Sequence, residues 1–142
     1  MFAHANFEGV FLEMQNVVAN DEAFSENGKN RWFAKDRPEK MRQLMIDRGC
    51  KNDEIATAHR VLTDAFPLCN DRNLLAHGDW WHFDTTADEI TVRADRDRNG
   101  EEQHRCFSAG TLTEIAERLD ALELELWHVK RAIERRASDH DA

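Results

Sequence analysis

Proline and glycine are scarce in this sequence, with 2 Pro and 6 Gly among 142 residues. This scarcity excludes collagen-like and Pro/Gly-rich disordered chains, and 41% hydrophobic with 33% charged residues is typical of a globular chain. Cysteine is also rare. Cys50, Cys69 and Cys106 are odd in number and never spaced as Cys-x-x-Cys, which argues against a disulfide framework and against a thiolate zinc site. A reducing compartment suits such cysteines, so we expect a cytoplasmic protein.

Long hydrophobic runs are absent as well. No apolar stretch approaches the ~18 residues that a membrane-spanning helix needs. The first residues have neither the basic start nor the apolar core of a signal peptide. We therefore expect neither secretion nor membrane insertion, and the length predicts one domain over residues 1–142, because domains commonly have ~100–200 residues.

Basic residues are too few to give the chain a broad cationic surface. The formal net charge is -9, which argues against a protein that holds nucleic acid over a wide surface. The only positive segment is 29–51, with eight basic and three acidic side chains. Its simplest interpretation is a solvated helix with its connecting loop. Any contact with nucleic acid must therefore be local.

Apolar residues with helical spacing predict most of the architecture. Phe7, Val10, Phe11, Met14, Val17 and Val18 lie on one side of a helix that fades near Asn20. A second helix is predicted from the Asp36 cap to Gly49, and a third from 52 to 66. Pro67 is expected to kink or break the third helix, and a shorter helix then follows over 68–77.

A small sheet and a long helix are predicted for the rest of the chain. Residues 80–83, 89–94 and 104–107 are rich in aromatic or β-branched side chains and predict antiparallel strands, with a turn at Asn99-Gly100. A helix capped by Thr111 and Glu114 is expected to run to about residue 136, before a frayed tail. Its leucine-rich stripe should pack on another helix, in the same chain or in a partner. The sequence thus predicts a mainly α fold, a bundle of four to five helices with a small antiparallel sheet inserted before the long C-terminal helix. The residues of this stripe are Leu112, Ile115, Leu119, Leu122, Leu126, Val129 and Ile133.

Residues 70–82 concentrate the side chains that can do chemistry. If the helix continues through His77, Asn73 lies four residues before it on the same face. Arg72 lies about 140° around the helix from His77. Arg72 and His77 can therefore converge only where the helix ends or across a symmetric dimer.

This stretch resembles the Arg-x(4–6)-His motif of HEPN domains. The neighbouring residues fit the string Arg-Asn-x-x-Ala-His-Gly-x-Trp that families of this kind often carry, and the strong match covers residues 70–81. HEPN domains are helical bundles whose active members are metal-independent ribonucleases, many of them toxins or antiviral proteins. The resemblance implies a homodimer that pairs two motifs in one cleft. The matching residues are Arg72, Asn73, Ala76, His77, Gly78 and Trp80.

The resemblance implies RNA cleavage of the toxin or defence type, without metal or cofactor. A ribose 2′-OH would attack the neighbouring phosphate, with His77 as general base or acid. Arg72 would bind the phosphate and stabilise the charge that builds on it, while Asn73 orients one of these groups. The product would be a 2′,3′-cyclic phosphate.

Several residues outside the motif are candidates for binding RNA. Arg93 and Arg96 lie on the predicted hairpin and can offset the negative charge. Trp80 and Trp81 should point to opposite faces of their strand, so that one is core and the other can stack on a base. The expected partners are a second copy of the chain, a small or specific RNA such as tRNA, and an antitoxin-type protein.

Two other interpretations of the same residues remain open. Arg72 could pair with Asp71 or Asp79, and His77 could be a structural residue at the helix C-terminus. The chain would then be a non-catalytic HEPN-like bundle that binds a protein partner or a nucleotide. In the other interpretation, a metal-dependent hydrolase, the cluster His77, Asp79, His82 and Asp84 would hold the metal, although its spacing matches no known ligand set.

Overall fold

The computed structural model describes residues 2–19, 32–94 and 103–141, and it has the predicted mainly α architecture. A three-stranded antiparallel sheet is inserted before the long last helix, as the sequence predicts. The elements of the described part are the helices α1 (Phe2–Ala19), α3 (Arg37–Asp47), α4 (Asn52–His77) and α5 (Ala109–Asp141), the 3₁₀ turn η1 (Ala34–Asp36), and the strands β1 (Asp79–Asp84), β2 (Glu89–Ala94) and β3 (Gln103–Ser108).

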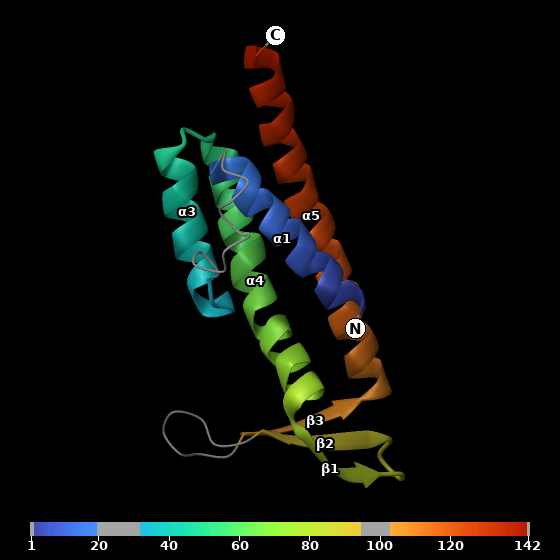
Figure 1. Ribbon diagram of the computed structural model, residues 1–142. Helices are drawn as coiled ribbons and strands as arrows, with labels where there is room; N and C mark the ends of the chain where they lie inside the picture. The colour runs from blue at the N-terminus through green and yellow to red at the C-terminus, as the bar shows by residue number, and fades with distance from the viewer. Residues whose placement is uncertain (1, 20–31, 95–102, 142) are drawn as a thin grey trace.

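Helices α4 and α5 are the two longest and pack against each other, and α1 lies along α5 (Figure 1). Helix α3 packs on the other side of α4, and the sheet crosses the end of the bundle where α4 stops and α5 begins (Figure 1). The amino-terminal end of α1 lies at this same end (Figure 1). The sheet, the start of α1 and the last turns of α4 therefore surround one region of the molecule.

The hydrophobic core forms where the apolar faces of the helices, predicted from the sequence periodicity, pack together. Phe7, Phe11 and Met14 of α1 are fully buried, which confirms the first predicted helix and its apolar side. Most of the α5 stripe, from Ile115 to Ile133, is buried in the same cluster. Since this stripe is covered within the chain, it gives no support of its own to a dimer.

The three strands form a sheet in the order β1-β2-β3, and its register brings one face onto the helices. Val92 of β2 and Phe107 of β3 are buried on that face and belong to the helical core cluster. All three predicted strands are confirmed. The turn expected at Asn99-Gly100 lies outside the described residues.

Helix α4 is continuous through Pro67, so the prediction of a break and a separate helix over 68–77 is wrong. Proline removes one backbone donor, which costs a single hydrogen bond here. The turns on both sides of it are held in the core by buried residues, Leu62 and Ala65 before it and Leu68 and Cys69 after it. Packing of both halves into the same core cluster outweighs the local preference for a break.

Helix α5 begins before the predicted position and ends after it. The Thr111 N–H donates to the Ser108 hydroxyl at 3.1 Å, so Ser108 rather than Thr111 caps the helix. The predicted end near residue 136 is wrong too, since α5 continues to Asp141 with no proline or glycine after Gly110 to stop it. No helix in the described ranges is both long and apolar enough to cross a membrane.

Candidate functional site

The C-terminal end of α4 carries the motif residues, and the sheet fixes where that helix stops. The Gly78 N–H donates to the Leu74 carbonyl at 2.7 Å and closes the last turn. A Cβ on Gly78 would lie 2.5 Å from this carbonyl oxygen and 2.6 Å from a methyl of Val92. Only glycine allows the helix to end this close to β2, so His77 is held as the last residue of α4.

Arg72 and His77 do not meet within one chain. His77 is exposed, and no hydrogen bond or ion pair joins its side chain to another described residue. Arg72 is half-buried, and its Nη1 donates to the Asn73 side-chain oxygen at 3.2 Å. The structure thus joins Arg72 to Asn73 and leaves His77 apart, as the ~140° between the two positions requires.

The ion pairs that would make Arg72 purely structural are not formed in the described part of the chain. Asp71 is taken by Arg105 of β3, with nitrogen-oxygen distances of 3.0 and 3.1 Å. Burial raises the pKa of Asp71, and the nearby Arg105 opposes that rise. Arg72 has no carboxylate partner among these residues, and its Nε is buried without a hydrogen bond.

Arg72 instead faces His4, which the sequence analysis did not single out. Both residues line a cleft of about 780 Å³ between α1 and α4. Both also line a smaller, apolar pocket of about 310 Å³ beside it. The spacing of His4 and Glu8 on one helical face was the available signal, because residues four apart are neighbours on a helix.

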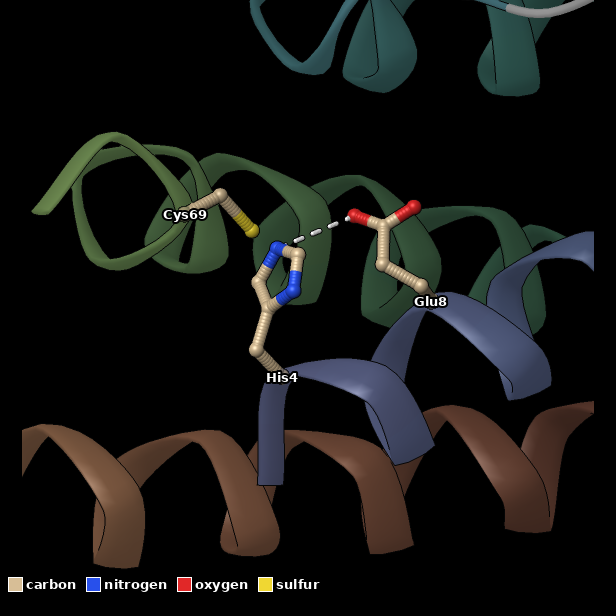
Figure 2. A group of neighbouring side chains, drawn as sticks. All are labelled: His4, Glu8 and Cys69. Atoms are coloured by element: carbon tan, nitrogen blue, oxygen red, sulfur yellow. Dashed lines mark ion pairs between the residues drawn. The ribbon is translucent and has the colours of Figure 1, made fainter. Parts of the chain in front are cut away.

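His4, Glu8 and Cys69 form a compact group between α1 and α4 (Figure 2). The His4 Nε2 lies 3.4 Å from a carboxylate oxygen of Glu8 (Figure 2). Arg37 of α3 donates to both oxygens of Glu8, at 2.6 and 2.7 Å. Arg37 is therefore buried, although its segment was expected to be a solvated face.

Burial sets the protonation of this group. It lowers the pKa of His4, an effect that Glu8 opposes and that Arg72 and Arg37 reinforce. It raises the pKa of the Cys69 thiol to about 11. At neutral pH His4 is therefore uncharged and Cys69 is a thiol, which is not nucleophilic.

The donor atoms of this group lie within 4.8 Å of one another, but they do not suit a divalent cation. Both Glu8 oxygens are held by Arg37, and a metal would have to displace that guanidinium. It would also have to remove the proton of the Cys69 thiol, whose pKa burial raises to about 11. The arrangement serves better to position His4 beside Glu8, which Arg37 holds in place.

The other proposed ligand cluster does not assemble. Within the described ranges, the His4 group is the one place where three potential ligands gather, and His77, Asp79, His82 and Asp84 form no such group. Among the described residues, the four side chains named for a metal-dependent hydrolase therefore do not gather as a ligand set.

The candidate RNA-binding residues fall on two faces of the sheet. Trp80 pairs with Val92 in register and lies on the side of the helices, where it lines the apolar pocket. Arg93 lies on the opposite face, with its guanidinium carbon 5.7 Å from the ring centre of Trp81. The Trp81 ring also lies edge-on to the His104 ring, with 6.1 Å between the two ring centres. Arg96 lies outside the described residues.

Neither tryptophan of β1 is core, so the expectation that one would be buried is wrong. Trp80 is 61% exposed and Trp81 is 62% exposed. The sheet register puts β1 at an edge, and the core cluster includes no residue of this strand.

Comparison with protein-family models, with curated proteins and with solved structures found no match.

Proposed function

We propose that the chain is a metal-independent endoribonuclease of the HEPN type. The observation that carries this proposal is the state of Arg72, a half-buried guanidinium in a cleft without a carboxylate partner in the described part of the chain. Burying an arginine without a partner costs free energy. A phosphate in the cleft would give the guanidinium an anionic partner, because guanidinium and phosphate match in geometry and charge.

The residues of the α4 end have the chemistry for cleavage by an internal nucleophile. His77 takes the proton of the ribose 2′-OH, and the 2′ oxygen forms a bond to phosphorus. The bond from phosphorus to the 5′ oxygen breaks, and this oxygen receives a proton from a second histidine or from water. Arg72 stabilises the negative charge of the phosphorane, and Asn73, already bonded to Arg72, orients it. The products are a 2′,3′-cyclic phosphate and a 5′-hydroxyl.

The active unit is a homodimer in this proposal. Arg72 faces α1 whereas His77 is exposed at the end of α4, so one phosphate reaches both groups when a second copy supplies one of them. A two-fold axis would create two equivalent composite sites.

RNA would be held in addition by the exposed face of the sheet. Trp81 offers an aromatic surface on which a base can stack, and Arg93 lies beside it. The net charge of -9 restricts this contact to a small or specific RNA, or to a site on tRNA.

A second candidate function is favoured by one observation. Arg72 lies in one pocket with His4 and not with His77, which suits a non-catalytic bundle that binds a protein partner, such as an antitoxin, or a nucleotide.

The deciding experiment is incubation of the purified protein with tRNA and total RNA in excess EDTA. The proposal expects 2′,3′-cyclic phosphate ends from the wild type and a loss of at least a hundredfold in His77→Ala and Arg72→Ala. The matched controls are His128→Ala and Arg42→Ala, which remove exposed residues outside the site. Folded protein that leaves every RNA intact would refute the ribonuclease and favour the binding module.

Mixed dimers test the composite site. When His77→Ala and Arg72→Ala chains are refolded together in equal amounts, half of the dimers are mixed, and each mixed dimer has one intact site. The mixture should therefore recover roughly a quarter of wild-type activity. Activity no higher than that of the separate variants would place both residues in a site within one chain.

A further inference from the structure

A small apolar pocket opens where α1, α4, α5 and β1 meet. Its volume is about 310 Å³, which is in the range of small-molecule sites. Hydrophobic side chains make most of its wall, and His4 and Arg72 are its two ionisable residues. The apolar wall consists of Ala3, Leu75, Trp80, Leu112, Ile115, Ala116 and Leu119.

The described residues that line this pocket carry a single net positive charge at neutral pH. Arg37 is neutralised by Glu8, and burial keeps His4 uncharged at neutral pH. Arg72 is the remaining cation, and its Nε is buried without an acceptor. A monoanion would balance this charge, whereas a dianion would leave one charge uncompensated in a largely apolar site.

We propose that this pocket binds a small hydrophobic carboxylate, with its charge on Arg72 and its aromatic or branched aliphatic body against Leu112 and Trp80. A carboxylate presents two oxygens to a guanidinium, and the apolar walls exclude water from the pair. This inference is independent of the ribonuclease, since it concerns a ligand of the free protein and needs no RNA. If both proposals hold, the ligand competes with RNA phosphate for Arg72.

The position of Trp80 provides the readout. Its indole N–H donates to the Leu75 carbonyl at 3.0 Å, and the ring forms part of the pocket wall. The chain has four tryptophans, so an ¹H-¹⁵N spectrum shows few indole signals, and Trp80→Phe assigns the relevant one. Three probes separate the contributions: phenylacetate has charge and ring, phenylacetamide has the ring alone, and acetate has the charge alone.

The proposal expects phenylacetate to shift the Trp80 signal saturably and to bind at least about tenfold more tightly than phenylacetamide and acetate. Arg72→Ala should lower its affinity about tenfold or more, while Arg42→Ala, on the surface of α3, should not change it.

Filling the pocket tests where phenylacetate binds and leaves Arg72 unchanged. Ala116→Phe places a ring in the pocket and should abolish the phenylacetate shift. Ala121→Phe makes the same change on the exposed side of α5 and should leave binding intact. Equal binding of acetate, equal binding of phenylacetamide, or a titration unaffected by Ala116→Phe would each overturn the proposal. Since no RNA is present, these outcomes are separate from the ribonuclease assay.

Discussion

Arg37 is paired with a carboxylate and Arg72 is not, and this difference should appear in the free energy of unfolding of their alanine variants. Arg37 is held by Glu8 through two short charged hydrogen bonds, and its guanidinium carbon lies 4.2 Å from the ring centre of Phe11. Arg37→Ala leaves Glu8 without its main partner. Removing one member of a buried pair costs about 3–5 kcal/mol, and the lower end applies because the Glu8 side chain keeps 23% exposure and can regain some water.

We therefore expect Arg37→Ala to lower the free energy of unfolding by about 3 kcal/mol, or the Tm by about 10 °C for a domain of this size. Arg72→Ala loses no ion pair with a described residue and removes a poorly solvated Nε, so its change should stay within about 1 kcal/mol of zero. Urea unfolding followed by circular dichroism at pH 7.5 measures both, with the surface variant Arg42→Ala as control.

Two results would refute this reasoning. If Arg72→Ala were as destabilising as Arg37→Ala, Arg72 would be a structural residue, and the argument that it awaits an anion would fail. If Arg37→Ala stayed within about 0.5 kcal/mol of the wild type, the pair with Glu8 would contribute no more than an exposed ion pair does.

Three further changes test other parts of the structure. Burial lowers the pKa of His4, so below pH 6.5 the unfolded chain binds more protons than the folded one. The free energy of unfolding should therefore fall as the pH drops from 7 to 5, and it should fall less steeply in His4→Gln. Urea titrations at each pH measure this. Gly78→Ala should cost about 2–3 kcal/mol in the same assay, since its Cβ meets Val92 and the Leu74 carbonyl, and an unchanged stability would contradict the close approach. Pro67→Ala should raise the free energy of unfolding by about 1–2 kcal/mol, because Pro67 is an exposed residue inside a helix. A lower free energy of unfolding would mean that the proline ring makes stabilising contacts.

The parts of the fold that were predictable from sequence are those that local periodicity determines. The spacing of Phe7, Phe11 and Met14 predicts a helix and its buried side, and both are confirmed. The three strands follow from short β-rich runs in the same way. Pro67 shows the limit, because its effect depended on how well the flanking turns pack against distant residues.

Burial of the strand side chains depended on the layers around them. Alternation predicts that Trp80 and Trp81 differ in direction, yet both are exposed. Which side chains are covered is decided by how far the helices extend over β1, an edge strand. A strand's own sequence does not contain that information.

The candidate site was predictable only where its residues are close in sequence. The motif on α4 contains Arg72 and Asn73, and these two are joined. His4, which lies across the cleft from Arg72, is 68 residues away from it in the sequence, and Glu8 and its partner Arg37 are 29 residues apart. Such pairs arise from helix packing, which spacing along one helix does not reveal.

The motif string divides into residues that folding explains and residues that it does not. Gly78 ends α4 against β2, and the Trp80 indole caps the free carbonyl of Leu75 at the helix end. Arg72 and His77 form no ion pair with any described residue, and Arg72 leaves a buried nitrogen unsatisfied. Sequences keep local features consistent with their fold, and departures concentrate at functional sites. Function is therefore to be sought at Arg72 and His77, while the rest of the string provides the rigid helix end that presents them.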